Sequence, residues 1–148
     1  MKTLRALDLC SGIGGFRAGC EMLNPHIFFD VVGFAEIDKY PKVAYRAMYG
    51  TRDELDLGDI KLLTRADGEE FNGGFLEKSQ FRSKRIMQNI PDHDILFAGF
   101  PCQPFSNAGK KKTFSDDRGL LFDEVIRLAK AKKPRFLFLE NVKHILKV

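Results

Sequence analysis

The residue best placed for chemistry is a cysteine held between two prolines. Residues 97–109 run FAGFPCQPFSNAG, with Cys102 between Pro101 and Pro104. The prolines restrict the backbone on both sides of the cysteine. A nucleophilic thiol needs such a stiff, partly exposed position and a route to the thiolate. No histidine is adjacent, so the segment does not indicate a Cys–His hydrolase. A buried, inert cysteine is the alternative, but it gives no reason for the flanking prolines.

A glutamate at the end of a later apolar segment is the second candidate. Residues 135–141 run RFLFLEN, and Glu140 leaves this segment just after its last leucine. A partly desolvated glutamate can hold a proton near neutral pH and act as a general acid. A surface acid at a turn is the alternative interpretation. If the two segments lie side by side, one cleft would hold a thiol nucleophile and an acid.

A glycine cluster near the N-terminus indicates a ligand site of another kind. In DLCSGIGGFRAG, Gly12, Gly14 and Gly15 stand between an expected strand and an expected helix. Such glycines allow a tight turn and let a ligand approach the backbone. Their spacing is G-x-G-G rather than G-x-G-x-x-G, which disfavours a pyrophosphate site and a nicotinamide dehydrogenase. A tight turn without a ligand is the alternative.

Acidic residues follow the next two expected strands. Glu36 lies about 20 residues past the glycines, where a carboxylate can accept hydrogen bonds from both ribose hydroxyls. Asp38 fits a helix N-cap better. In the GDI stretch, Asp59 could accept from an adenine amino group and Ile60 could contact the ring. Together these ends suggest an adenosine ligand without a pyrophosphate, and S-adenosylmethionine fits that description.

Apolar runs that alternate with helix-period segments must position these residues. Strands are expected at Leu4–Leu9, Phe28–Glu36, Leu57–Ile60, Asp94–Phe100 and Arg135–Asn141. Helices are expected at Gly14–Leu23, Pro41–Gly50 and Gly119–Lys133, the first with Phe16, Cys20 and Leu23 on one face. Strands that are apolar on both faces predict an α/β fold with a mostly parallel, doubly wound, Rossmann-like sheet. Ligands of such sheets bind at the carboxyl ends of the strands, where each motif falls.

Composition limits the class of protein. The 148 residues are 30% charged and 44% apolar, as in one soluble domain, and no apolar run is long enough to span a bilayer. Without an export signal, the three cysteines argue against disulfides, and the scattered histidines predict no metal site. We therefore expect a cytoplasmic protein. A net charge of +4 is compatible with nucleic acid. Residues 64–89 do not follow the alternation of strand and helix patterns, and we expect them to form a surface insertion.

The motifs resemble those of a known family. DLCSGIGGF, EIDKY, GDI, GFPCQPFS, DDRGLLF and ENV follow the order of the cytosine-5 DNA methyltransferases. The resemblance covers nearly the whole chain, which is similar to the N-terminal part of the catalytic domain of these enzymes. It implies an incomplete sheet of the S-adenosylmethionine-dependent methyltransferase type over residues 1–148. The family's later motifs and its target-recognition domain are absent.

The resemblance implies a mechanism in which a cytosine flipped out of double-stranded DNA is attacked at carbon 6 by Cys102. Glu140 binds and protonates the ring nitrogen, and carbon 5 takes the methyl group of S-adenosylmethionine, which leaves as S-adenosylhomocysteine. The family often has a tryptophan at position 37 and a phenylalanine at position 10, so we expect weaker ring packing here. The implied cofactor residues are Asp8, Cys10, Gly12, Gly14, Glu36, Ile37, Asp59, Ile60, Pro101 and Leu121.

Residues 102–119 resemble the family's mobile loop that closes over DNA. A solvated lysine-rich loop is the alternative, but the position beside the nucleophile favours phosphate contacts. The implied DNA contacts are Gln103, Ser106, Lys110, Lys111, Lys112 and Arg118.

The resemblance leaves several functions open. The expected one is the modification enzyme of a bacterial restriction-modification system, with this chain a fragment or a split subunit. In the second case another polypeptide would supply the missing motifs and the target-recognition domain. An RNA cytosine-5 methyltransferase acting on tRNA is one alternative. An inactive accessory module that binds only cofactor or DNA is another, and the presence of Cys102 and Glu140 argues against it.

Overall fold

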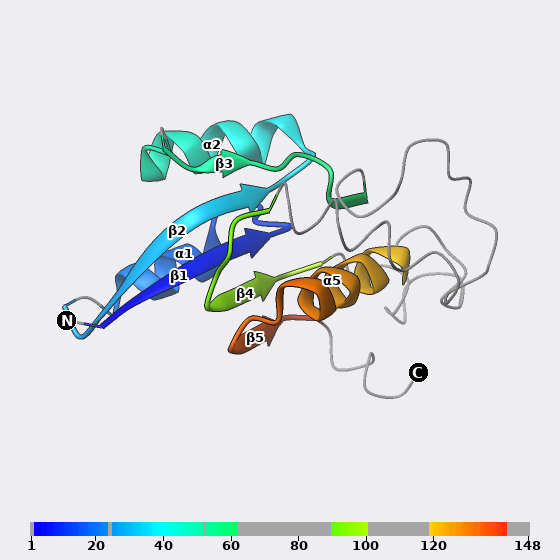
Figure 1. The fold of residues 1–148 in the computed structure, drawn as a ribbon. Helices are drawn as coiled ribbons and strands as arrows, with labels where there is room; N and C mark the ends of the chain where they lie inside the picture. The colour runs from blue at the N-terminus through cyan, green and yellow to red at the C-terminus, as the bar shows by residue number, and fades with distance from the viewer. Residues whose placement is uncertain (1, 24, 52, 62–89, 101–118, 142–148) are drawn as a thin grey trace.

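Strands and helices alternate along the part of the chain that the structure describes (Figure 1). The computed structural model describes residues 2–23, 25–51, 53–61, 90–100 and 119–141. The strands are β1 (Lys2–Leu9), β2 (Ile27–Ala35), β3 (Leu55–Asp56), β4 (Ile95–Ala98) and β5 (Phe136–Leu139). The helices are α1 (Gly15–Glu21), α2 (Lys39–Tyr49) and α5 (Gly119–Lys132).

The strands of these described residues form one sheet in the order β3-β2-β1-β4-β5. Every neighbouring pair is parallel, which confirms the predicted α/β fold. The chain builds outward from β1 in one direction to β3 and then in the other direction to β5. The reversal lies between β1 and β4, and doubly wound sheets bind their ligands at the carboxyl ends of the strands beside such a reversal.

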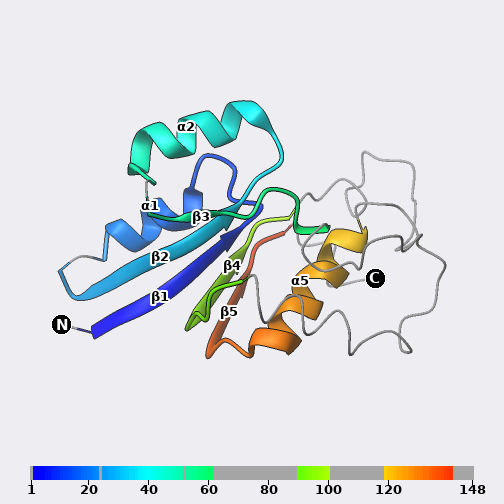
Figure 2. The ribbon, with the colours of Figure 1, turned by 45° about the horizontal axis from the view of Figure 1, so that its top comes forward.

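Helices cover both faces of the sheet (Figure 2). On the face of α1, Cys20 packs with Ala6, Ile95 and Phe97. The opposite face carries α5, where the core contains the following buried residues: Leu7, Leu9, Leu96, Ala98, Val125 and Leu128. Because consecutive strand residues point to opposite faces, a strand covered on both faces must be apolar throughout. β4 satisfies this condition with four buried residues.

Local signals explain where α2 begins and ends. Asp38 caps its N-terminus by accepting a hydrogen bond from the backbone N–H of Tyr40, which confirms the N-cap interpretation of this residue. Pro41 lies in the first turn, where its missing N–H has no cost. Gly50 ends the helix in the left-handed conformation with φ 59°. Because Asp38 supplies the cap, the helix begins two residues before the predicted start.

Two predictions about the elements are wrong. The third strand is Leu55–Asp56 rather than Leu57–Ile60. The Leu57 N–H still donates to the Phe34 carbonyl of β2 at 2.8 Å, but the chain turns at Gly58 with φ 62° and a helical turn starts at Ile60. Leu57 and Ile60 therefore pack into the core beyond the end of the strand. α1 ends at Glu21, and Leu23 lies beyond it with 47% of its surface exposed rather than on the buried helix face.

The edge of the sheet formed by β5 is exposed. β5 is an edge strand whose four residues, Phe136 to Leu139, are each at least 41% exposed. The sheet therefore has an apolar edge beside the strand end that carries Glu140.

None of the helices in the described ranges is long and apolar enough to cross a membrane.

Candidate active site

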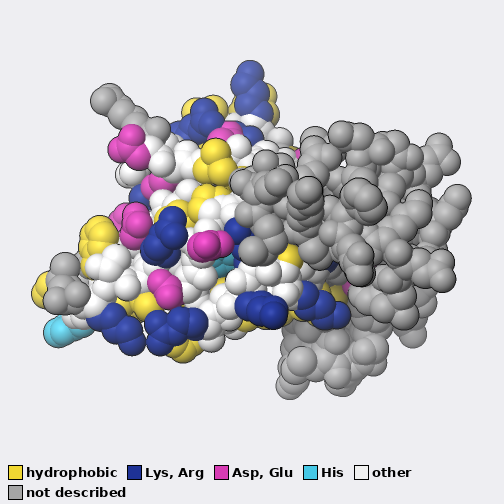
Figure 3. All heavy atoms as spheres, in the orientation of Figure 1, with side chains coloured by type: hydrophobic (Ala, Val, Ile, Leu, Met, Phe, Trp, Pro, Cys, Tyr) yellow, Lys and Arg dark blue, Asp and Glu magenta, His cyan; other side chains and the backbone are white. Residues whose placement is uncertain are grey.

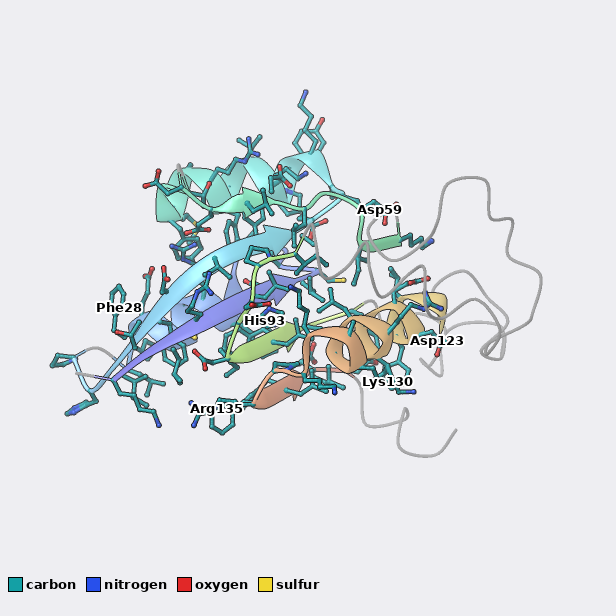
Figure 4. All side chains as sticks on the ribbon, in the orientation of Figure 1. Phe28, Asp59, His93, Asp123, Lys130 and Arg135 are labelled. Carbon is teal, nitrogen blue, oxygen red and sulfur yellow. The ribbon has the colours of Figure 1, made fainter. Side chains whose placement is uncertain are left out.

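The predicted site residues follow the order of the strands along one edge of the sheet. Asp59 follows β3, Glu36 follows β2, and the glycine turn follows β1. Beyond them, β4 leads to Pro101 and Cys102, and β5 leads to Glu140. Figure 4 shows Asp59 at this edge and Phe28 and Arg135 toward the opposite one. Residues far apart in the sequence therefore share the carboxyl edge.

The glycine turn after β1 is built from left-handed backbone. Cys10, Gly12 and Gly14 have φ of 52°, 56° and 92°. The turn is closed by a hydrogen bond from the Gly14 N–H to the Ser11 carbonyl at 2.8 Å. A Cβ atom on Gly14 would lie 2.4 Å from the Tyr49 ring, and the Tyr49 hydroxyl donates to the Gly14 carbonyl at 3.0 Å. Only glycine fits this position, because both the backbone angle and the packing exclude a side chain.

Glu36 joins the glycine turn to the end of β2. Its Oε2 accepts a hydrogen bond from the Gly12 N–H at 2.8 Å, and its Oε1 accepts from the Asp38 N–H at 2.8 Å. Each carboxylate oxygen has a second lone pair that can accept another donor. The two backbone bonds thus hold the half-buried carboxylate in one orientation, which suits an acceptor for ribose hydroxyls.

Asp8 is buried beneath the turn, with 2% of its surface exposed. Burial raises the pKa of its carboxyl from the usual 3.8 to about 7, against the smaller opposing effects of Tyr45 and Arg17. The Tyr45 hydroxyl donates to Asp8 Oδ2 at 3.4 Å. Asp8 Oδ1 and the nearby Ser11 Oγ are buried without a hydrogen-bond partner among the described residues.

The two unpaired atoms provide a test of whether a cofactor fits here. Buried polar atoms are nearly always paired in folded proteins, so an unpaired pair beside a tight turn calls for an external partner. Asp8 and Ser11 lie at the end of β1, next to the strand end that carries Glu36. The polar amino-acid end of S-adenosylmethionine would supply such a partner, and the residues present fit that group.

A polar cluster supports the turn from the side of α2. The Arg17 guanidinium donates to Glu54 at 2.5 Å and to the Tyr45 hydroxyl at 3.4 Å. It also lies 4.6 Å from the centroid of the Tyr49 ring. The pKa of Glu54 is raised by burial, although Arg17 opposes the shift. Sequence reasoning missed this cluster, because no local pattern links Arg17 to residues in α2 and before β3.

The cysteines in the described ranges are not set up as nucleophiles. Burial raises the pKa of the half-buried Cys10 thiol to about 12, and the nearby carboxylates of Glu36, Asp8 and Asp59 add to the shift. Burial likewise raises the pKa of Cys20 to about 11. Both thiols therefore stay protonated near neutral pH.

The residues predicted to contact adenine differ in their exposure and in their contacts. Asp59 Oδ1 accepts from the Lys61 N–H at 2.9 Å and so caps the following helical turn. Ile60 is 3% exposed in the core, whereas Ile37 is 72% exposed. Leu121 packs, partly buried, against the α5 side of the core. The adenine contacts of these four residues stay predictions.

Glu140 lies at the end of β5, against the end of β4. Its backbone N–H donates to the Ala98 carbonyl at 3.0 Å. Its Oε2 lies 3.7 Å from the position that a Cβ on Gly99 would occupy. The next residue, Asn141, donates from Nδ2 to the Phe100 carbonyl at 2.9 Å, a contact that sequence reasoning missed.

Several predicted residues lie outside the described ranges, and so does the predicted insertion at 64–89. These residues are Pro101, Cys102, Gln103, Ser106, Lys110, Lys111, Lys112 and Arg118. Over the described part of one face, basic and acidic side chains are interspersed (Figure 3). The predicted DNA contacts therefore stay predictions.

Structural comparison supports the fold. A Dnmt2 methyltransferase of S. pombe aligns with 95% of this chain and 36% of its own, with a TM-score of 0.58 and 22% identity. The Entamoeba histolytica methyltransferase EhMeth aligns with 99% of this chain and 40% of its own, with a TM-score of 0.62 and 20% identity. At these identities the likeness concerns the fold alone.

Sequence comparison identifies the family. The chain is 44% identical over 143 residues to the type II methyltransferase M.NlaX of Neisseria lactamica, covering 95% of this chain and 37% of the relative. It is 38% identical over 141 residues to M.HhaI of Haemophilus parahaemolyticus, covering 95% of this chain and 34% of the relative. The chain thus spans little more than a third of these relatives. The family model for C-5 cytosine-specific DNA methylases matches residues 4–148, and the chain belongs to that family.

Proposed function

We propose that this chain is the cofactor-binding and nucleophile-bearing part of an enzyme that transfers a methyl group to carbon 5 of cytosine in double-stranded DNA. The observation that carries the proposal is the order of polar groups along the carboxyl edge. Asp59 and Glu36 follow β3 and β2, and Asp8 is the second-last residue of β1, in the order of adenine, ribose and amino acid in one extended ligand. In the sequence, Cys102 comes four residues after the end of β4, and Glu140 directly follows β5.

This order would bring the reacting groups together. An adenosine ligand seated on β3 and β2 would extend its sulfonium end toward β4, the strand that leads to Cys102. When bound, S-adenosylmethionine supplies an electrophilic methyl group. Glu36, fixed by the N–H groups of Gly12 and Asp38, would orient the ribose without having to reorganise.

Cys102 and Glu140 would make the cytosine ring reactive. The Cys102 thiolate forms a bond to carbon 6, and the electron pair of the carbon 5–carbon 6 double bond shifts into the ring. Glu140 gives its proton to ring nitrogen 3, so that no free anion accumulates. Carbon 5 becomes nucleophilic and would take the methyl group, with the methyl–sulfur bond breaking and S-adenosylhomocysteine leaving. A water molecule then accepts the carbon-5 proton, which restores the double bond and expels Cys102 as thiolate.

We also propose how the chain relates to a complete enzyme. Residues 1–148 form the N-terminal part of the catalytic domain, and the target-recognition domain lies elsewhere. It would be supplied by a further part of the same protein or by a second polypeptide. The type II names of the relatives support a modification role in a bacterial restriction-modification system, in the cytoplasm.

Transfer of a labelled methyl group tests the substrate. The complete enzyme should label duplex DNA, and digestion should release 5-methylcytosine, whereas transcribed tRNA should remain unlabelled. Cys102→Ser should abolish transfer and leave S-adenosylhomocysteine binding unchanged. Preferential labelling of tRNA would replace DNA by RNA as the substrate. Full transfer by the Cys102→Ser variant would contradict the covalent mechanism.

A further inference from the structure

We propose that Asn141 is a positioning residue that holds the backbone leading to the nucleophile; this rests on the function proposed above. Asn141 follows β5 and donates from Nδ2 to the Phe100 carbonyl at 2.9 Å. The two residues are 41 positions apart in the sequence. Phe100 is 3% exposed, and Cys102 is the second residue after it. The side-chain bond therefore acts on the chain immediately before the reactive thiol.

The bond begins where the regular pairing of the sheet stops. The register of β4 and β5 ends with Ala98 opposite Leu139, and the Glu140 N–H still donates to the Ala98 carbonyl at 3.0 Å. Beyond this point the Asn141 amide binds the chain of β4. Pro101 has no N–H, so it cannot itself donate a backbone hydrogen bond. Asn141 thus extends the connection between the strands by two residues toward Cys102.

Phe100 is held on two sides. Its ring packs 5.5 Å from the ring of Phe122 in α5, within the core, while its carbonyl accepts from Asn141. On the residue before it, a Cβ at Gly99 would lie 3.7 Å from Glu140 Oε2 and 3.6 Å from the Phe16 ring. Glu140 and Asn141 therefore touch the same short segment of backbone from consecutive positions.

Two consecutive residues would therefore have different roles in the reaction. Glu140 would face the cytosine, while Asn141 fixes the backbone from which the thiol is presented. Because Glu140 and Asn141 are covalently joined, the Asn141 hydrogen bond would help to fix the position of Glu140 relative to the Phe100 backbone. A small misplacement of reacting groups can slow a reaction by about 100-fold. Asn141 should therefore affect the chemical step more than cofactor binding.

Asn141→Asp tests the proposal in the complete enzyme. The carboxylate keeps the shape of the amide but has no N–H to donate at neutral pH. We expect the single-turnover rate of methyl transfer to fall by about 10-fold to 100-fold. The dissociation constant for S-adenosylmethionine should change by no more than about twofold, because Asn141 follows β5, away from the cofactor strands.

Leu139→Ala is the matched control for loss of stability. It removes an exposed apolar side chain of β5 and leaves the Asn141 bond in place. The proposal predicts that Asn141→Asp slows transfer far more than Leu139→Ala at equal melting temperature. Transfer by Asn141→Asp at the wild-type rate, or no slower than by the control, would overturn it.

Hydrogen exchange separates this inference from the proposed function. If the wild-type enzyme methylates neither DNA nor RNA, the proposed function fails, and amide exchange over residues 98–102 decides the positioning role alone. Faster exchange in Asn141→Asp than in Leu139→Ala would support the role. Equal exchange in the two variants would contradict it.

Discussion

Glu36 shows how one residue can serve both the fold and a ligand. Its carboxylate binds the N–H of Gly12 in the glycine turn and the N–H of Asp38 at the start of α2. Both contacts need acceptors, so the position demands a carboxylate rather than any polar group. Free lone pairs on the same oxygens are what the ribose role requires. The structural role and the proposed binding role thus select the same side chain.

Replacing this carboxylate should weaken cofactor binding. In Glu36→Gln the amide NH₂ would face the N–H of Gly12 or of Asp38, so the substitution should cost about 1–3 kcal/mol of binding free energy. Calorimetric titration with S-adenosylhomocysteine measures this loss. Glu21→Gln, on the exposed side of α1, is the control and should bind like the wild type. Unchanged affinity in Glu36→Gln would remove Glu36 from the ribose role.

Asp8 should make the stability of the protein depend on pH. Its pKa is raised from 3.8 to about 7 by burial, so the folded state retains a proton that the unfolded state has lost between these values. The free energy of unfolding should then fall as pH rises from about 4 to about 7, by up to about 1.4 kcal/mol per unit, and the Asp8 contribution should level off above.

Urea unfolding of the wild type and of Asp8→Asn at pH 4.5, 6 and 7.5 measures this contribution. The asparagine carries no titrating proton, so the difference in unfolding free energy between the two proteins should shrink or reverse as pH rises. A difference that is constant across the three pH values would contradict the raised pKa of Asp8.

At the scale of elements, the glycine turn and α1 form one unit. Gly14 is the N-cap of α1 and has φ of 92°, and Tyr45 and Tyr49 of α2 leave no room for a Cβ there. Gly19 lies within the same helix, and a Cβ on it would meet no atom within 4 Å. A side chain is therefore excluded at Gly14 but can be accommodated at Gly19.

Alanine at these two positions should have opposite effects on stability. Gly14→Ala should lower the free energy of unfolding by about 2 kcal/mol or more, because it combines backbone strain with a steric clash. Gly19→Ala should raise it by about 0.5–1 kcal/mol, as expected inside a helix. Thermal unfolding of both variants checks the pair. Equal effects would mean that α2 does not brace the turn.

The elements also show which parts of the fold the sequence could predict. Buried strands such as β4 and the amphipathic α5 were predictable, because continuous apolar runs and a helical period are local signals. β3 has only two residues, and the apolar Leu57 and Ile60 beyond it resemble a strand in sequence although they pack into the core outside it. A strand this short is defined by its partner β2 rather than by its own pattern.

Contacts between distant segments could not be predicted from the sequence. The strand-end acids Glu36 and Glu140 could be proposed from position and from the family's motifs. In contrast, Asn141 contacts Phe100, and Tyr49 contacts Gly14, across 41 and 35 positions. Such pairs become visible only when the sheet order is known, because no periodicity within either segment encodes its partner.

At the scale of the whole molecule, one edge of the described sheet is apolar and exposed. The chain spans 37% of M.NlaX, and its sheet ends at β5 with apolar residues that are exposed on both faces. Phe138 is 54% exposed, and its ring centroid lies 5.9 Å from that of Phe97. Exposed apolar edge strands promote association between chains.

The 148-residue chain alone should therefore self-associate through β5. Phe138→Lys should increase the monomer fraction in sedimentation velocity at a given concentration, because a charge at the edge opposes strand pairing. Val43→Lys on α2 replaces a side chain of similar exposure, 59%, and should leave association unchanged. Equal association of the wild type and Phe138→Lys would show that β5 is not the contact.

The proposed reaction requires Cys102 to attack a cytosine that is placed beside a cofactor on β1 and β2. The most direct measurement is peptide mapping of the protein after incubation with S-adenosylmethionine and duplex DNA that contains 5-fluorocytosine. Fluorine cannot leave carbon 5 as a proton does, so the covalent product should persist. We expect a methylated fluorocytosine adduct on Cys102. An adduct on Cys10 or Cys20, or none in a complete enzyme that methylates ordinary DNA, would contradict it.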